Sequence, residues 1–176
     1  MNNKYLAVTN EWLRNGKPNS HDIVIDDYFI DELGIRHPIK GIEKVHSASK
    51  NSDEYMITTI LKETLGGEIH MVSRITNMAN SHLGVKTPDY IWNNEKWDLK
   101  TPRNVGHFKN TIERFLKKKN ARIQAEKYII NYINFDNITN QQIINVVHRT
   151  LKNRNWVKCI IIIRNRKIFR IYSKIK

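Results

Sequence analysis

The chain has 176 residues, 40% of them hydrophobic, which is enough for a packed core and excludes a chain that is disordered throughout. Lysine and arginine outnumber aspartate and glutamate by 30 to 17, and the net charge of +13 favours a polyanionic partner, either nucleic acid or an acidic membrane surface. The single cysteine, Cys159, excludes an internal disulfide and a cysteine-based zinc cluster, and no apolar run is long enough to span a bilayer.

The N-terminal part of the chain has the weakest pattern. We expect residues 1–44 to form a segment appended to a domain that covers residues 45–176. Short strands are expected at residues 23–25 and 28–30, and Gly34 and Pro38 are expected to break the extended structure.

A helix is expected at the start of the domain. Apolar residues recur at helical spacing after Ser52, as far as Leu65. Gly66 and Gly67 are expected to end this helix, because glycine adopts the left-handed backbone found at many helix C-termini. Residues 68–72 predict a strand, and a polar loop follows it.

The C-terminal part alternates between helical and strand patterns. Residues 108–132 contain the longest helical pattern, with one apolar stripe and many basic residues, and residues 129–133 are expected to leave it as a strand. A second helix is expected over residues 139–151. Residues 156–163 and 167–172 predict two strands around a turn. This order of elements predicts an α/β layered domain with a C-terminal β-hairpin.

Residues 87–101 carry the most informative pattern, which predicts a β-hairpin with a two-residue turn at Asn93-Asn94. Asparagine tolerates the positive φ that a type I′ turn requires at both central positions. Counting outward from this turn places Asp89 opposite Asp98. Because side chains alternate between the faces of a strand, the face expected to pack on the core is apolar and aromatic. It consists of Tyr90, Trp92, Trp97 and Leu99.

Two acids and a lysine share the opposite face of this hairpin. Asp89 and Asp98 are expected to lie directly across the strand pair, with β-carbons about 4.5–5.5 Å apart, and like charges so placed destabilise a sheet. A divalent cation between them would remove the repulsion, and Mg²⁺ commonly takes one or two carboxylates with water and phosphate. Lys100, on the same face, is suited to orient a water nucleophile or to offset charge on a phosphate. The alternative is that Asp98 forms a surface pair with Lys100 or Lys96 and has no catalytic role.

At these residues the sequence resembles the PD-(D/E)XK nuclease superfamily, with Pro88-Asp89 followed by the Asp-x-Lys of residues 98–100. More narrowly, it looks like the tRNase domain at the C-terminus of CdiA-type contact-dependent growth inhibition toxins. The narrower resemblance covers about residues 45–176. It is carried by residues 65–69, residues 87–90, residues 96–100, and Gln124 with the strand after it. The resemblance implies a restriction-endonuclease-like core, with a central mixed β-sheet flanked by helices.

The resemblance also implies an activity and a set of site residues. It implies hydrolysis of nucleic acid with a divalent metal, Mg²⁺ ahead of Mn²⁺ or Zn²⁺, bound by Asp89, Asp98 and Glu68. An acid from the first helix, Glu54 or else Glu63, is implied as a further catalytic residue, together with Glu68 and Gln124. RNA, above all tRNA, is the substrate that it favours, and a toxin domain of this kind acts in a cytoplasm and has a cognate immunity protein. A DNA endonuclease on the same fold and a non-catalytic nucleic-acid-binding protein of a mobile element remain alternatives.

The basic part of the long helical pattern is the expected contact with nucleic acid. Such a cluster neutralises phosphates and draws in a polyanion through counterion release. Its members are Arg114, Lys117, Lys118, Lys119 and Arg122. A membrane-surface protein would instead need a basic amphipathic helix whose apolar residues can leave the core, whereas this apolar stripe suits packing, so no membrane partner is expected. The first 17 residues contain no continuous apolar run typical of a signal peptide, which agrees with a cytoplasmic protein.

Overall fold

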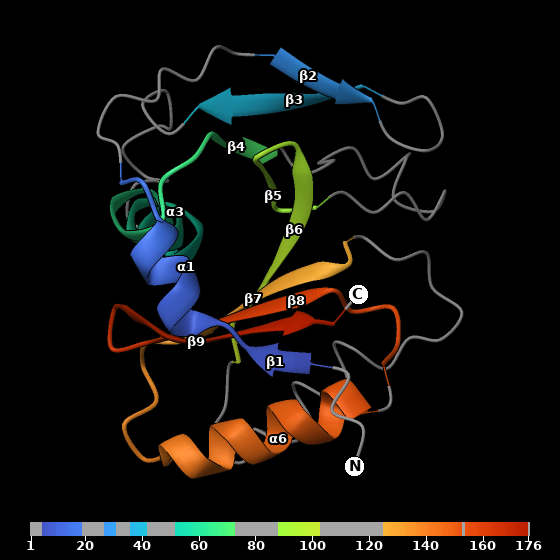
Figure 1. Cartoon of the computed structure of the whole chain (residues 1–176). Coiled ribbons are helices and arrows are strands. Elements are labelled where there is room, and N and C mark those ends of the chain that lie inside the picture. Colours follow the sequence, from blue (N-terminus) through green and yellow to red (C-terminus); the bar gives the residue numbers. More distant parts are fainter. Residues whose placement is uncertain are drawn as a thin grey trace.

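The computed structural model describes residues 5–18, 27–30, 36–41, 52–72, 88–102, 125–152 and 154–175. Its strands are β1 (Tyr5–Ala7), β2 (Asp27–Ile30), β3 (Arg36–Gly41), β4 (Ile69–Val72), β5 (Tyr90–Trp92), β6 (Glu95–Lys100), β7 (Lys127–Tyr132), β8 (Cys159–Arg164) and β9 (Lys167–Lys174). Its helices are α1 (Thr9–Asn15), α3 (Asp53–Thr64) and α6 (Asn140–Lys152). The described strands form one sheet in the order β1-β9-β8-β7-β6-β5-β4-β3-β2 (Figure 1).

The sheet is mixed, and its parallel part lies in the middle. β6 pairs with β7 and β7 with β8 in parallel, whereas all other neighbouring strands are antiparallel. Parallel neighbours need a crossover connection, and α6 lies in the connection from β7 to β8. The predicted α/β class, with a mixed sheet, is therefore confirmed.

Helices cover the sheet on both faces, with α1 and α3 on one side and α6 on the other (Figure 1). Each side has its own buried core, and the isoleucines of β8 alternate between them. Ile161 and Ile163 belong to the α3-side core, whereas Ile160 and Ile162 belong to the α6-side core. A central strand that is buried on both faces needs such a continuous apolar run.

Three tryptophans define the α3-side core. Trp92 and Trp97 from the hairpin lie 5.0 Å apart between ring centroids, and Trp12 of α1 meets their rings at 6.3 and 6.5 Å. The indole N–H of Trp92 donates to the carbonyl oxygen of Gly66 at 3.0 Å, which satisfies the one polar group of this buried side chain. These contacts fix the hairpin against the end of α3.

The helix boundaries expected from the sequence are confirmed for α3. The hydroxyl of Ser52 accepts the N–H of Tyr55 at 3.2 Å and caps the helix. Gly66 and Gly67 follow the helix with φ of 69° and 98°, the left-handed conformation that ends it.

The expected start of α6 is also confirmed. Thr139 and Gln142 cap it reciprocally: the Thr139 hydroxyl accepts the Gln142 N–H at 3.2 Å, and the Gln142 side-chain oxygen accepts the Thr139 N–H at 2.8 Å.

Two elements differ from expectation. Pro38 does not interrupt extended structure, because it lies inside β3, opposite Tyr28 of β2. The strand expected at residues 129–133 begins earlier, at Lys127. The strand expected at residues 23–25 falls outside the described residues. The helical pattern expected over residues 108–132 also lies outside them as far as residue 124, and its end is wrong, because Lys127 and Tyr128 belong to β7. No helix in the described part of the chain is long and apolar enough to cross a membrane.

Residues 5–18, expected to belong to a segment appended to the domain, contribute to the same sheet. β1 pairs antiparallel with β9, and the Val8 N–H donates to the Ile171 carbonyl oxygen at 2.9 Å. The Ile171 N–H in turn donates to the Thr9 hydroxyl at 2.9 Å. This early segment therefore completes the edge of the sheet beside β9.

Candidate active site

The candidate site is built on the hairpin of β5 and β6, whose predicted register is confirmed. Tyr90 pairs with Trp97 and Trp92 with Glu95. The turn residues Asn93 and Asn94 have φ of 50° and 62°, as a type I′ turn requires. The register is therefore set by local turn chemistry.

Asp89 lies just before β5, at the end of the hairpin far from its turn. Its carbonyl oxygen accepts the N–H of Val72 in β4 at 3.0 Å, which ties the backbone there to the sheet. Its side-chain Oδ2 accepts the N–H of Leu99 in β6 at 2.6 Å. The carboxyl group of Asp89 therefore spans to the strand that carries Asp98 and Lys100.

Asp98 is a buried acid, with 1% of its surface exposed. Its Oδ2 is 2.5 Å from Nζ of Lys100, two residues further along β6. Its Oδ1 is also buried, and it has no hydrogen-bond partner among the described residues. A buried acceptor left unsatisfied costs about 1–3 kcal/mol, more when it is charged. A proton or a cation near Oδ1 would remove this cost.

The two acids influence each other strongly. Burial, then the charge of Asp98 and a hydrogen bond between the two carboxyl groups, raise the pKa of Asp89 to about 7. The N–H of Leu99 and the charge of Lys100 act in the opposite direction and do not cancel the increase. The carboxyl group of Asp89 therefore gains or loses its proton near neutral pH.

The donor set suits a hard cation bound through few protein ligands. The described residues contain no group of three or more histidine, cysteine or acidic side chains that could hold a metal. Mg²⁺ needs no such group, since it is commonly bound by one or two carboxylates and otherwise by water and phosphate. The unsatisfied Oδ1 of Asp98 and the raised pKa of Asp89 both fit a cation between these two carboxyl groups.

Glu54 lies in the first turn of α3 and comes close to the same end of the hairpin. Its backbone carbonyl oxygen accepts the hydroxyl of Tyr90 at 2.9 Å. Burial raises the pKa of Tyr90 most, and the charges of Asp89 and Glu54 raise it further, so both acids lie near this hydroxyl. The structure thus brings Glu54 to the neighbourhood of Asp89.

Glu68 lies at the other end of the hairpin, next to its turn. Its N–H donates to the side-chain oxygen of Asn93 at 3.1 Å, and its carboxylate meets His70 at 2.5 Å. Asp89 lies beside Val72, to whose N–H its carbonyl oxygen is bonded, and Val72 follows Glu68 by four residues. Glu68 and Asp89 are therefore separated by roughly 13 Å along the strand. The structure therefore does not bring Glu68 together with Asp89.

The remaining predicted site residues lie outside the described residues. They are Gln124 and the basic cluster of Arg114, Lys117, Lys118, Lys119 and Arg122.

Tyr128 is a neighbour of the site that sequence reasoning missed. It is the partner of Asp98 in the parallel pairing of β6 with β7, and it is 4% exposed. Burial raises its pKa most, followed by the charge of Asp98. Its ring meets the ring of Trp156 at 5.7 Å in an edge-to-face arrangement. The aromatic character of this strand was visible in the sequence, but its parallel register with β6 was not.

Comparison with known proteins gives one match. Residues 86–168 match the family model of the contact-dependent growth inhibition CdiA C-terminal domain, over just under half of the chain. The matched part contains Asp89, Asp98 and Lys100, and it extends through α6 and β8 into β9. No curated protein and no solved structure matches the chain. The match supports the resemblance of this part to a CdiA-type toxin domain.

Proposed function

We propose that this protein is a metal-dependent nuclease that hydrolyses phosphodiester bonds at Asp89, Asp98 and Lys100. One observation carries the proposal. The buried Asp98 and the half-buried Asp89 face each other across a hairpin with a lysine beside them, and one carboxylate oxygen of Asp98 has no partner among the described residues. Lys100 balances the charge of one carboxylate, and two ionised carboxylates this close repel each other unless a proton or a further cation lies between them. The match to a toxin family adds independent support.

The residues divide the work according to their contacts. Asp89 and Asp98 would hold the cation through carboxylate oxygens, and Asp89 would lose its proton as the cation binds. When bound, a divalent cation polarises a phosphoryl oxygen and lowers the pKa of a water molecule. Lys100 donates to Asp98 and carries the positive charge closest to it, which suits it to offset charge that develops on the phosphate. Glu54 would contribute a further carboxylate from α3.

We propose RNA, above all tRNA, as the substrate. The net charge of +13 suits a polyanion of either kind. A domain with one centre cuts one strand at a time, which suffices for a folded RNA, whereas cutting both strands of a duplex usually needs a symmetric dimer. The match to the CdiA C-terminal domain favours a toxin that acts in the cytoplasm of a target cell and is neutralised by a cognate immunity protein.

Incubation with two substrates and three metal conditions tests the proposal. Purified protein is mixed with tRNA or with plasmid DNA at equal phosphate concentration, in Mg²⁺, Mn²⁺ or EDTA. We expect cleavage of tRNA in Mg²⁺ or Mn²⁺ and none in EDTA. Cleavage of plasmid with tRNA left intact would overturn the substrate and leave the site in place. Cleavage that is undiminished in EDTA would overturn the metal-dependent mechanism.

A further inference from the structure

A short segment after α6 lies beside the candidate active site and combines an aromatic ring with positive charge. Residues 154–158, Arg-Asn-Trp-Val-Lys, lead from α6 into β8. Trp156 lies against Tyr128, and Tyr128 is the strand partner of Asp98. Trp156 is half-buried, so part of its ring remains accessible. The segment is thus two contacts away from the acid pair.

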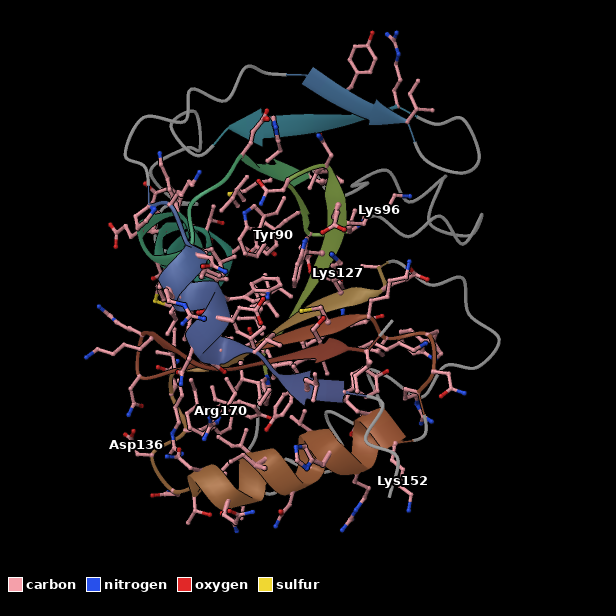
Figure 2. All side chains as sticks on the ribbon, in the orientation of Figure 1. Tyr90, Lys96, Lys127, Asp136, Lys152 and Arg170 are labelled. Atoms are coloured by element: carbon pink, nitrogen blue, oxygen red, sulfur yellow. The ribbon has the colours of Figure 1, made fainter. Side chains whose placement is uncertain are left out.

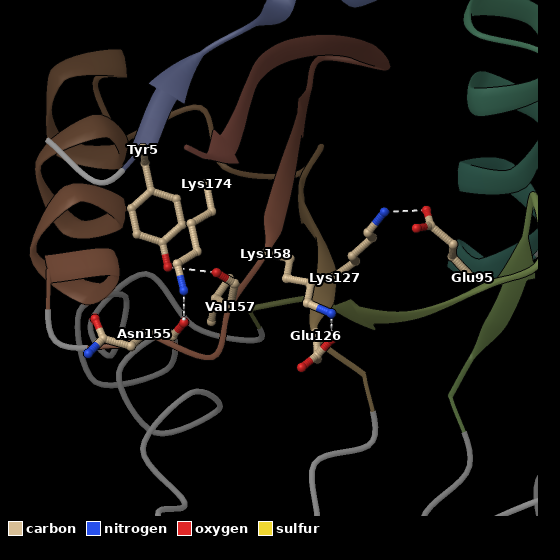
Figure 3. Close-up of polar contacts among 8 residues, drawn as sticks. All are labelled: Tyr5, Glu95, Glu126, Lys127, Asn155, Val157, Lys158 and Lys174. Atoms are coloured by element: carbon tan, nitrogen blue, oxygen red, sulfur yellow. Dashed lines mark hydrogen bonds and ion pairs between the residues drawn. The ribbon is translucent and has the colours of Figure 1, made fainter. Parts of the chain in front are cut away.

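The backbone of this segment is held in place by β1, by β9 and by the residue that precedes β7 (Figure 3). The hydroxyl of Tyr5 in β1 donates to the carbonyl oxygens of Arg154 and Val157 at 2.8 and 2.6 Å. The ammonium of Lys174 in β9 donates to the carbonyl oxygen of Asn155 at 2.5 Å. On the other side of the segment, the Lys158 N–H donates to the carbonyl oxygen of Glu126, the residue before β7, at 2.7 Å. A surface fixed in this way loses little conformational entropy when a ligand binds.

The segment and the helix end that leads into it are basic. From Lys152 to Lys158 the sequence contains three basic residues, Lys152, Arg154 and Lys158, and no acid. Asp136 and Lys152 lie at opposite ends of α6, with Lys152 at the end that leads into the segment (Figure 2). Glu126 forms an ion pair with Lys158, whose side chain is still 60% exposed. The side chains around Trp156 therefore present positive charge to a polyanion.

We propose that Lys152 and residues 154–158 form a preformed binding surface for the single-stranded part of the nucleic acid substrate. Trp156 stacks on a base, while Lys152 and Lys158 contact backbone phosphates. This binding surface rests on the proposed nuclease function, and it specifies where the nucleic acid strand that enters the active site is held. Aromatic rings on a basic surface are the usual means of holding single strands without reading their sequence. Because Trp156 touches Tyr128, the strand partner of Asp98, this surface lies next to the candidate active site.

Tryptophan fluorescence tests the stacking separately from cleavage. The Asp98→Asn protein, which is expected to bind but not to cleave, is titrated in Mg²⁺ with a single-stranded RNA of about 12 nucleotides, within the site sizes known for such surfaces. Three of the four tryptophans belong to the cluster of Trp12, Trp92 and Trp97. We expect RNA to quench the fluorescence. The quenching should be lost when Trp156→Phe is added and retained when Trp12→Phe is added instead.

Affinity gives the second readout, by anisotropy of the labelled RNA on the same Asp98→Asn background. Trp156→Leu keeps an apolar side chain and removes the aromatic face, so affinity should fall roughly tenfold, whereas Trp156→Phe should lose less. The double change Lys152→Gln and Lys158→Gln should flatten the dependence of affinity on salt. The matched control is Arg166→Gln with Lys167→Gln, two exposed residues in the turn after β8 and at the start of β9.

Each outcome separates this inference from the proposed function. Unchanged quenching in Trp156→Phe, or unchanged affinity in a folded Trp156→Leu protein, overturns the binding surface even if the wild-type protein cleaves RNA. If Trp156→Leu does not fold, the Trp156→Phe quenching and the paired lysine variants still decide. Wild-type protein that neither binds nor cleaves nucleic acid overturns both the surface and the nuclease.

Discussion

Replacing Asp89 by asparagine should stabilise the metal-free protein, and increasingly so as the pH rises. Asparagine keeps the shape of the side chain and an oxygen that accepts the Leu99 N–H. It also supplies an N–H donor that can satisfy the buried Oδ1 of Asp98. The variant therefore resembles the protonated form of Asp89, but it cannot ionise.

The magnitude follows from the pKa of Asp89, which is raised from 3.8 to about 7 in the folded protein. Because the folded-state pKa lies above the unfolded value, the folded protein binds the proton more tightly. The resulting stabilisation is complete below about pH 4 and is lost as the pH rises to about 7. Each pH unit between the two values costs about 1.4 kcal/mol, so ionisation of Asp89 destabilises the fold by at most about 4 kcal/mol. Between pH 5 and pH 8 the further loss is at most about 3 kcal/mol.

Urea unfolding of the wild-type and Asp89→Asn proteins in EDTA, at pH 5 and pH 8, measures this effect. The two proteins share all seven histidines, so background titration cancels in the difference. We expect the variant's advantage in unfolding free energy to grow by about 2–3 kcal/mol from pH 5 to pH 8. Asp136→Asn, at an exposed acid, should show no such change. An advantage that is the same at both pH values would refute the reasoning about the acid pair.

Three other changes test the roles of individual residues. Lys100→Ala should lower kcat by roughly 10²–10³-fold with little change in substrate affinity, because the role of Lys100 is at the reacting phosphate. The control Lys96→Ala, on the same strand, should lower kcat far less, and single-turnover kinetics measure both variants. Glu54→Gln should reduce the rate of cleavage by about tenfold or more, and by more than Glu68→Gln does. The reason is that Glu54 lies near Tyr90 and Asp89, while Glu68 lies at the hairpin turn. Equal losses of activity would contradict the placement of these acids. Glutamine at Lys117, Lys118 and Lys119 should lower the slope of log affinity against log salt by up to roughly 2, as measured by binding titrations at several salt concentrations. An unchanged slope would show that this basic cluster does not contact the nucleic acid.

The sequence predicted the features that depend on neighbouring residues. The turn at Asn93-Asn94 determines the register of the hairpin, so the position of Asp98 across from the start of β5 followed from counting. The caps of α3 and α6 are equally local, since Ser52 and Thr139 each bond within the first turn of their helix. Local chemistry of this kind can be recognised without knowledge of the fold.

Features that depend on distant pairing could not be predicted. β1 pairs with β9 from the other end of the chain, and the short segment Tyr5–Ala7 has no pattern that indicates this partner. Tyr128 reaches Asp98 only because β6 and β7 are parallel, and a parallel pair leaves its register to the crossover between the strands. Pro38 illustrates a different limit. Proline is uncommon within strands, yet here it lies inside β3.

Single-turnover cleavage of tRNA in Mg²⁺ by the Asp98→Asn protein tests the central claim most directly. Asp98 is the buried acid whose carboxylate meets Lys100 on one side and has an unsatisfied oxygen on the other. The matched control is Asp136→Asn, an acid-to-amide change at an exposed residue at the far end of α6 (Figure 2). We expect the wild-type and Asp136→Asn proteins to cleave at equal rates and the folded Asp98→Asn protein to be inactive. Cleavage by Asp98→Asn at the wild-type rate would contradict the assignment of the active site.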